Sequence, residues 1–243
     1  MTVVHGDEGP ELQQDGVEVS SFVLVPGACH GGWWYEPLVE ELERRGHRAR
    51  ALTLAGLEPE GMAGAGLVNL DSHVEEVTAA LTKAAYQGGE AVVLVGHSYA
   101  GSVISGVADR VPQQVRALVY LDAFVPEDGD SCWSMTTDEQ RHWYIAGAGR
   151  SGVAVDPPPF FDERARPHPL ATLVQRSRLT GAWRLVPVKS YVAATGWPQE
   201  SSPFTSTAER LSADPAWTYH RWDTRHNVMH DGPQRVLELL LTI

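Results

Sequence analysis

AVVLVGHSYAG, residues 91–101, is the stretch that decides the fold of this chain. Its apolar first half, Ala91 to Val95, predicts a buried strand, and the pattern from Ser102 to Arg110 predicts a helix. The turn between them holds Ser98, flanked by small residues that let the strand and the helix approach closely. A serine on such a sharp turn has its hydroxyl lifted clear of the sheet, where a histidine can reach it. The stretch therefore predicts an α/β fold in which Ser98 is presented as a nucleophile.

The match to the pattern G-x-S-x-G is incomplete, because Ala100 stands where the second glycine usually lies. One methyl group is tolerable there if the helix lies slightly farther from the strand. A glycine-rich turn with an incidental serine would give a similar pentapeptide. The rest of the chain therefore has to supply a base, an acid and an oxyanion site.

Length and charge narrow the class of protein. The 243 residues suffice for one α/β domain or two small ones with a sizeable core, and the formal net charge of −12 disfavours nucleic acid and anionic membranes as partners. No apolar run approaches the ~20 residues of a membrane span. The two cysteines, Cys29 and Cys132, lie far apart, which is typical of buried thiols in a reducing compartment. We expect a cytoplasmic monomer or homodimer that acts on a small molecule, with no membrane or nucleic-acid partner.

Strand and helix patterns alternate along most of the chain, which implies right-handed crossovers and a mostly parallel sheet flanked by helices on both faces. Strands are predicted at residues 21–25, 48–52, 91–95, 117–121, 188–193 and 217–222, and the longer helices at 33–45, 71–86, 102–110 and 233–241. Asp71 is the predicted cap of the second of these helices.

This alternation stops after Leu121. Residues 123–186 are rich in Pro, Trp and Arg and show only short helical patterns, near 138–146 and 170–179, with no strand. A long strandless excursion between two strands of a parallel sheet predicts a lid over the strand tips. The chain is accordingly divided into a flexible acidic N-terminal tail at 1–20, a core at 21–122 and 187–243, and a lid or cap insertion at 123–186.

The base is predicted from chain order. A serine hydroxyl is nearly inert at neutral pH, so it needs a base within reach, and the base needs an orienting acid. His226 lies just beyond the last predicted strand and before the final helix, which is where this architecture places its histidine. The other histidines considered are His97, His220 and His230, expected to be structural, and His142 and His168 in the lid, where a substrate contact is conceivable.

No metal or other cofactor is expected. His220, Asp223, His226 and His230 are of the right residue types for a metal, but they lack the short fixed spacing of a metal site.

The loop after the first predicted strand, PGACHGGW at residues 26–33, supplies the candidate oxyanion site. The backbone N–H groups of Ala28 and of Tyr99, the residue after Ser98, would converge on the substrate oxygen. Both loops would emerge at the same edge of the sheet, which weakens the alternative of a plain glycine-rich turn.

Four stretches together resemble the α/β-hydrolase superfamily, and within it the branch of plant methylesterases, hydroxynitrile lyases and their bacterial relatives. They are SFVLVPGACHGGWWYEPLVEELERRGHRARALTLAGL from Ser21, VVLVGHSYAGSVISGVADRVP from Val92, LVYLDAFVPEDG from Leu118 and HNVMHDGPQRVLELL from His226. The resemblance covers nearly everything from Ser21 onward except the lid. It implies an α/β-hydrolase fold, with Ser98 and His226 as catalytic residues and Ala28 and Tyr99 as the oxyanion hole.

The chain departs from that family at two positions. Pro26 stands where the family usually has a histidine, so a hydrogen bond that orients the oxyanion loop is missing. The usual acid position, just after the strand at 188–193, holds Thr195-Gly196-Trp197 and no carboxylate.

Asp122 is the predicted acid. It lies at the tip of the strand beside the nucleophile strand, from which a carboxylate can reach the same imidazole, and certain haloalkane dehalogenases resemble that arrangement. Glu200, the nearest acid on the following loop, is the possible alternative; Asp223, or no true acid, also stays open. Asp122 could instead cap a helix or anchor the start of the lid.

We expect a serine hydrolase that cleaves a carboxylic ester through an acyl-enzyme. Aromatic side chains in or near the predicted pocket and lid favour a bulky apolar or aromatic substrate, although each could instead pack in the core. They are Trp33, Trp34, Trp133, Trp143, Tyr144, Phe160 and Phe161.

Two alternatives stay open. One is a lyase or cyclase of a biosynthetic pathway that uses the same Ser and His pair, and the other is a small-molecule receptor on the same scaffold. Cyanogenic chemistry is not expected, because Gly27 and Asn227 replace the Thr and Lys of hydroxynitrile lyases.

Overall fold

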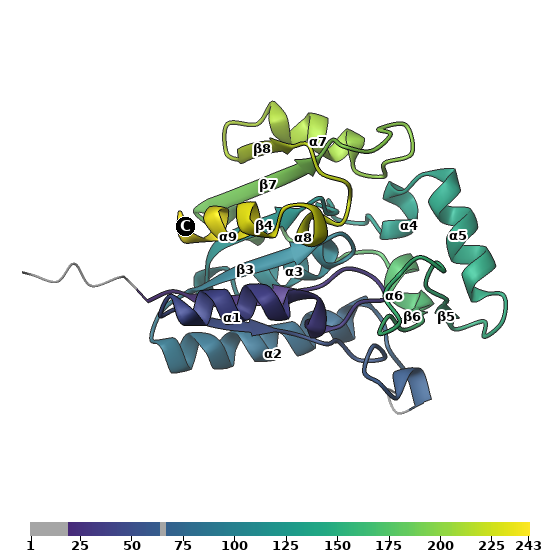
Figure 1. Cartoon of the computed structure of the whole chain (residues 1–243), viewed down its shortest axis with the longest axis horizontal. Coiled ribbons are helices and arrows are strands. Elements are labelled where there is room, and N and C mark those ends of the chain that lie inside the picture. Colours follow the sequence, from purple (N-terminus) through teal and green to yellow (C-terminus); the bar gives the residue numbers. More distant parts are fainter. Residues whose placement is uncertain (1–18, 64–66) are drawn as a thin grey trace, which may run out of the picture.

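A six-stranded sheet forms the centre of the computed structural model, which describes residues 19–63 and 67–243 (Figure 1). Its order is β2-β1-β3-β4-β7-β8, and every neighbouring pair is parallel. The prediction of a mostly parallel sheet is confirmed; the tail predicted at 1–20 lies, except for its last two residues, outside the described residues. The strands are β1 (Ser21–Val25), β2 (Arg48–Ala51), β3 (Val92–His97), β4 (Val115–Leu121), β7 (Val188–Ala194) and β8 (Thr218–Trp222).

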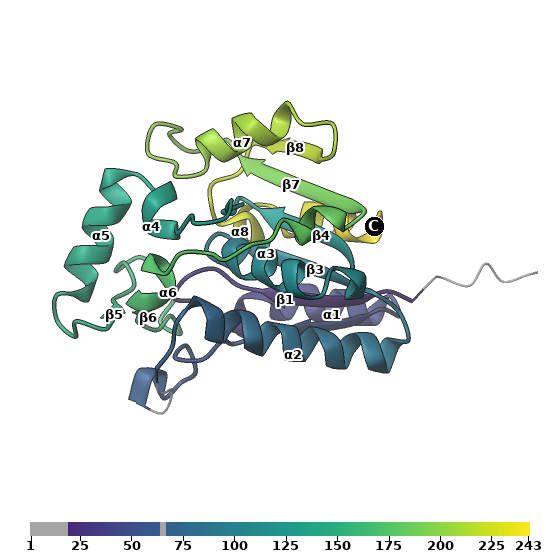
Figure 2. The ribbon, with the colours of Figure 1, turned by 180° about the vertical axis from the view of Figure 1, so that it is seen from behind.

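Helices cover both faces of the sheet. Helices α1 and α9 cover the face seen in Figure 1, and α2 and α3 cover the face seen in Figure 2. Alternate residues of one strand serve the two layers: Val23 belongs to the core under α2 and α3, and Leu24 to the core under α1 and α9. The core helices are α1 (Glu36–Arg44), α2 (Leu70–Gly88), α3 (Ala100–Arg110), α7 (Thr205–Ser212), α8 (Val228–Asp231) and α9 (Pro233–Leu241), with 3-10 turns η1 (Gly32–Tyr35), η2 (Gly61–Ala63) and η3 (Pro112–Gln114).

The start of α2 corrects one prediction. Asn69, not Asp71, caps this helix, because its side-chain oxygen accepts the N–H of Ser72 at 3.0 Å. The Ser72 hydroxyl in turn accepts the N–H of Asn69, also at 3.0 Å, which completes a capping box. Asp71 lies in the first turn of the helix, where it contacts residues 175–178 of the insertion.

Residues 123–174 lie beyond the carboxyl ends of the strands, and residues 175–186 return along α3 to the start of β7 (Figures 1 and 2). The expectation of no strand in this region is wrong, since β5 and β6 form a small antiparallel pair. The helix expected at 170–179 ends at Val174, because the backbone is extended at Gln175. The elements are α4 (Cys132–Met135), α5 (Asp138–Ala148), β5 (Ala154–Val155), β6 (His168–Pro169), α6 (Leu170–Val174) and the 3-10 turn η4 (Ala182–Leu185).

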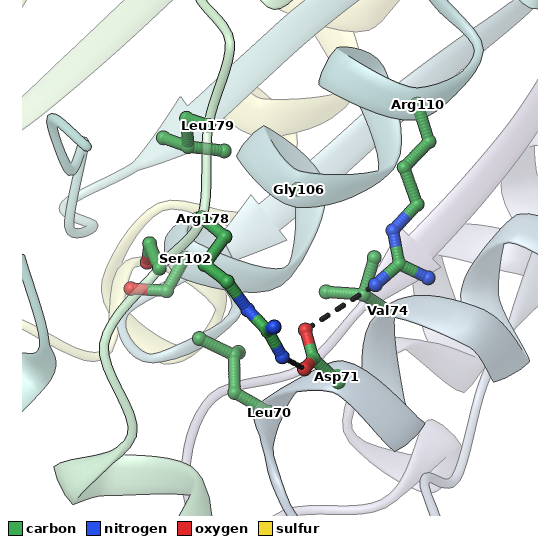
Figure 3. A pocket seen from close by; sticks show the side chains of 9 residues that line it. Leu70, Asp71, Val74, Ser102, Gly106, Arg110, Arg178 and Leu179 are labelled. Atoms are coloured by element: carbon green, nitrogen blue, oxygen red, sulfur yellow. Dashed lines mark hydrogen bonds and ion pairs between the residues drawn. The ribbon is translucent and has the colours of Figure 1, made fainter. Parts of the chain in front are cut away.

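A polar seam joins this insertion to the core. The carboxylate of Asp71 accepts hydrogen bonds from Arg178, from Gln175 Nε2 at 2.9 Å, and from Arg110 at 3.3 Å. Figure 3 shows the two guanidinium groups converging on this carboxylate from opposite sides of a small pocket. Each exposed ion pair contributes little to stability by itself. The hydrogen bonds from Gln175 and Arg178 to Asp71 therefore act together in holding the insertion against the core.

Neither a membrane span nor a metal cluster is found in residues 19–63 and 67–243. None of the helices there is both long and apolar enough to cross a bilayer. No group of three or more His, Cys, Asp or Glu side chains there is placed to hold a metal ion. The expectations for localisation, partners and cofactors stay predictions.

Candidate active site

Ser98 lies on the turn between β3 and α3 in a left-handed backbone conformation, with φ of 55°. Its N–H donates to the carbonyl of Leu121 at 3.3 Å, and its carbonyl accepts the N–H of Phe124 at 3.1 Å. A β-carbon added at Gly101 would lie 1.9 Å from the Phe124 carbonyl oxygen. Close approach of the segment after β4 therefore requires glycine at Gly101, and Ala100 is accommodated beside it.

His226 joins Ser98 to Asp122. Its Nε2 lies 3.1 Å from Ser98 Oγ, and its Nδ1 lies 2.7 Å from Asp122 Oδ2. Because an ionised carboxylate only accepts, the Nδ1 of a neutral His226 carries the proton, and Nε2 is left to accept from the serine hydroxyl. The three side chains form one hydrogen-bonded chain along which the serine proton can move to the imidazole.

Asp122 is held by the neighbouring strand β7. It is only 2% exposed and, like Ser98, has a positive φ, here 44°. Its N–H donates to the carbonyl of Val192 at 2.8 Å, and its Oδ1 accepts the N–H of Ala194 at 3.1 Å. The end of β7 therefore supplies a backbone N–H that orients the carboxylate of Asp122.

The other candidate acids lie elsewhere. Glu200 and Asp223 are both exposed, on the loops after β7 and β8. Among the described residues, Asp122 is the carboxylate that pairs with His226. The structure thus brings Ser98, His226 and Asp122 together, and it does not bring Glu200 to them.

Aromatic rings enclose the imidazole of His226. Ring centroids lie at 4.6 Å for His97, 5.1 Å for Phe204 and 5.4 Å for Trp197. Trp34 stacks on His97 at 4.4 Å. An imidazolium formed on His226 during a reaction would be attracted by the π-faces of Phe204 and Trp197. This role of Phe204 and Trp197 was not predicted from the sequence. Both follow β7, on the loop that lacks a carboxylate at the expected position.

His97, next to Ser98, ties the nucleophile turn to the loop of the base. Its Nε2 donates to the backbone carbonyl of His226 at 2.9 Å. Burial, followed by the nearby His226, holds the pKa of His97 well below its usual range, so it is neutral. The expectation of a structural role agrees with these contacts.

The candidate oxyanion loop passes directly against the nucleophile turn. A β-carbon at Gly27 would lie 2.7 Å from His97 Nδ1 and 3.0 Å from Ser98 Cβ, so glycine permits this approach. Among the hydrogen bonds of the described residues, none uses the backbone N–H of Ala28 or of Tyr99. Both groups therefore lack a protein partner within residues 19–63 and 67–243, which is a condition that an oxyanion hole requires of its donors.

Three of the predicted pocket residues gather beside this loop. Trp33, Trp34 and Phe161 surround the ring of His30, with centroids at 5.3, 5.7 and 4.9 Å. His30 Nδ1 in turn donates to the carbonyl of Ala28 at 2.8 Å. These aromatic side chains therefore adjoin the loop that carries Ala28.

The remaining predicted pocket residues lie in the insertion. Trp133 and Trp143 pack against Tyr144, at 6.3 and 5.2 Å, and Tyr144 is buried in the core of α4 and α5. Phe160 is 84% exposed. For Tyr144 the alternative of core packing therefore describes the observed contacts.

Comparison with known proteins places the chain among esterases and their structural relatives. The model of the alpha/beta hydrolase family matches residues 22–239. A carbendazim hydrolyzing esterase of Nocardioides sp. (strain SG-4G) is 33% identical over 93% of this chain and 100% of its own length. Methyl jasmonate esterase 1 of Vitis vinifera is 32% identical over 53% of this chain and 48% of its own.

Solved structures agree in fold. An extracellular alpha/beta-hydrolase from a Paenibacillus species, described as sharing homology with tobacco salicylic acid binding protein 2, has a TM-score of 0.74 at 22% identity, covering 92% of this chain and 98% of its own. A pyrethroid hydrolase has a TM-score of 0.70 at 20% identity, covering 92% of this chain and 96% of its own. At these identities the structures show the fold alone.

Proposed function

The chain belongs to the alpha/beta hydrolase family and is a carboxylic-ester hydrolase, and we propose that it acts through an acyl-enzyme formed on Ser98. The observation that carries this proposal is the chain of hydrogen bonds from Ser98 Oγ to His226 and on to Asp122, at 3.1 and 2.7 Å. An isolated serine hydroxyl is too weak a nucleophile, and this pairing is how proteins activate one.

In the proposed reaction, Ser98 Oγ attacks the ester carbonyl carbon while its proton passes to His226 Nε2. The negative charge that develops on the carbonyl oxygen is stabilised by the N–H groups of Ala28 and Tyr99. The ester C–O bond then breaks, and His226 gives its proton to the departing alcohol. A water molecule deprotonated by His226 next attacks the acyl-enzyme carbonyl; the bond to Ser98 Oγ then breaks, His226 returns the proton to Ser98 Oγ, and the carboxylic acid leaves. Throughout, Asp122 accepts a hydrogen bond from the Nδ1–H of His226 and stabilises the imidazolium without being protonated itself.

We propose a bulky apolar or aromatic substrate. Trp33, Trp34 and Phe161 present aromatic surface around His30, beside the loop of Ala28. Apolar walls with few polar groups are typical of small-molecule sites. Aryl esters, methyl esters of aromatic acids and carbendazim itself form a suitable test panel, with short alkyl acetates for comparison.

Labelling with a fluorophosphonate, followed by peptide mass spectrometry, tests the nucleophile. The expected adduct lies on Ser98, and the Ser98→Ala variant should neither be labelled nor turn over esters. Ser102→Ala is the matched control, because Ser102 is a buried serine at the third position of α3 whose hydroxyl contacts Cys132 Sγ at 3.5 Å.

The alternative functions give different results in the same experiment. A lyase or cyclase would convert no ester while still depending on Ser98, and a receptor would bind the panel without turnover. Two results would overturn the proposed acyl-enzyme on Ser98. One is labelling of Ser98→Ala at the wild-type rate, and the other is ester turnover by that variant at the wild-type rate.

A further inference from the structure

We propose that His168, in the insertion, is a positioning residue for the oxyanion hole, because it fixes the backbone next to Ala28. This inference rests on the proposed function, which assigns the N–H of Ala28 to the oxyanion. The sequence suggested no such role, since His168 lies 139 residues beyond the loop that it contacts.

Cys29, the residue after Ala28, is held by the insertion through both of its backbone polar groups. Its N–H donates to His168 Nδ1 at 3.2 Å, and its carbonyl accepts the N–H of Arg166 at 2.9 Å. Cys29 is only 1% exposed and has a φ of 68°, a left-handed conformation that residues other than glycine rarely adopt. External partners are therefore needed to keep the turn in this form.

The peptide groups around Ala28 are fixed at each end. The carbonyl of Ala28 accepts from His30 Nδ1 at 2.8 Å, and the N–H on the same peptide group is the one that donates to His168. On the preceding peptide group, the carbonyl of Gly27 accepts the N–H of His30 at 3.2 Å. The Ala28 N–H belongs to that preceding group, so its direction is set once these bonds are made.

The hydrogen bonds of His168 are consistent with a single protonation state. Nδ1 accepts from Cys29, so Nε2 carries the proton, and it donates to Thr172 Oγ1 at 2.9 Å. The Thr172 hydroxyl then donates to the carbonyl of Pro169 at 2.8 Å. Complete burial keeps the pKa of His168 well below its usual range, which leaves Nδ1 free to accept.

His168 also contacts the second proposed donor residue. Its ring lies 4.6 Å from the ring of Tyr99, edge to face. One buried side chain thus touches the residue that follows Ala28 and the side chain of Tyr99. In this chain, Pro26 offers the loop no side-chain hydrogen bond, and the bonds to Cys29 come from the insertion.

His73 offers a matched control. It is as fully buried as His168, and their rings lie 6.2 Å apart. Its Nε2 donates to the carbonyl of Ala55 at 2.9 Å, and its Nδ1 accepts from the hydroxyl of Tyr99 at 2.9 Å. It therefore shares with His168 a contact to the Tyr99 side chain but makes no bond to the backbone of the Ala28 loop. The comparison thus isolates the effect of the bond that His168 makes to that backbone.

Two readouts test the role of His168. We expect His168→Leu to lower kcat about 10²-fold, the scale of losing one oxyanion donor, while KM changes less than about threefold. Asn places an acceptor near the position of Nδ1, so His168→Asn should recover at least about tenfold of that loss, whereas His168→Gln, with its acceptor farther out, should not. His73→Leu should lower the Tm comparably and keep kcat within about threefold. Hydrogen exchange at the Cys29 amide should accelerate in His168→Leu and not in His73→Leu.

Several outcomes would overturn the inference. They are a wild-type kcat in His168→Leu, equal losses of kcat in His168→Leu and His73→Leu, or unchanged exchange at Cys29. If His168→Leu does not fold, the Asn and Gln variants carry the comparison, and equal kcat values for the two would overturn it. A wild-type protein that hydrolyses no ester and resists fluorophosphonate overturns the proposed function instead, while faster exchange at Cys29 would still show the contact with His168.

Discussion

The base side and the oxyanion side of the candidate site are held by different parts of the chain. On the base side, Asp122 and Ser98 receive their backbone hydrogen bonds from β7 and from the end of β4, which belong to the sheet. On the oxyanion side, Cys29 receives its bonds from Arg166 and His168, which belong to the insertion. The proton-transfer groups are therefore positioned by the core, and the backbone of the loop that carries Ala28 is positioned in part by the insertion.

The strongest test of the base side is removal of the nucleophile. Ser98→Ala should lower kcat by about 10⁴-fold or more, because the remaining binding groups cannot form an acyl-enzyme. Unfolding should stay cooperative, since the change removes one hydroxyl. Steady-state esterase assays with a thermal melt measure both. A loss below about tenfold would place the nucleophile elsewhere.

The acid comes next in size. Asp122→Asn keeps the shape of the side chain but no longer holds His226 in the correct tautomer, so kcat should fall about 10³- to 10⁴-fold. Glu200→Gln is the matched control and should cost at most about tenfold, because Glu200 is exposed. The reverse pattern would move the acid to Glu200. Mild effects of both would indicate a site that works with Ser98 and His226 alone.

Acid should destabilise both sides of the site together. Burial lowers the pKa of His73 to about 4 and the pKa values of His97 and His168 well below the usual range. Between about pH 4 and the unfolded value near 6.5, the unfolded chain therefore binds more protons, so stability is lost as the pH falls through this window. Each histidine should contribute a slope of about 1.4 kcal/mol per pH unit.

Urea denaturation at a series of pH values measures that slope. His73→Leu should reduce the slope of the free energy of unfolding against pH by the contribution of one histidine, whatever its effect on stability at neutral pH. A free energy of unfolding that stays constant from pH 6.5 down to 4.5 would contradict the neutral state assigned to the buried histidines.

The smallest expected effect concerns substrate choice on the oxyanion side. Phe161→Ala removes a ring that contacts His30 at 4.9 Å and should lower kcat/KM for aryl esters by about three- to tenfold relative to acetyl esters. Phe160→Ala, one position away and 84% exposed, should leave that ratio unchanged. If the ratio of kcat/KM for aryl esters to that for acetyl esters is the same in the two variants, this part of the insertion does not line the substrate pocket.

The features that the sequence could predict belong mostly to the sheet and the turns at its edge. The strands around Ser98 were predictable because apolar runs and turn residues act locally, and Asp122 was found because adjacent strand ends meet at one edge of a sheet. The geometry agrees with the predicted grouping of Ser98, His226 and Asp122, whose catalytic roles stay predictions.

The contacts that escaped prediction join segments far apart in the chain. The stacking of Phe204 on His226 and the bond from Cys29 to His168 depend on how the insertion and the loops fold back, and no local pattern encodes this. The pair β5 and β6 was missed because two residues per strand give no periodicity.

The left-handed residues after three neighbouring strands have a consequence for engineering. Cys29, Ser98 and Asp122 follow β1, β3 and β4, and they are the non-glycine residues with positive φ within the described ranges 19–63 and 67–243. Each such conformation costs roughly 1–2 kcal/mol. Backbone strain at the candidate site therefore lowers the stability of the whole protein. At Ser98 and Asp122 that cost is bound to the chemistry. The thiol of Cys29 takes no part in the proposed chemistry, so Cys29→Gly would relieve one of these strained conformations at the cost of the packing of a buried side chain.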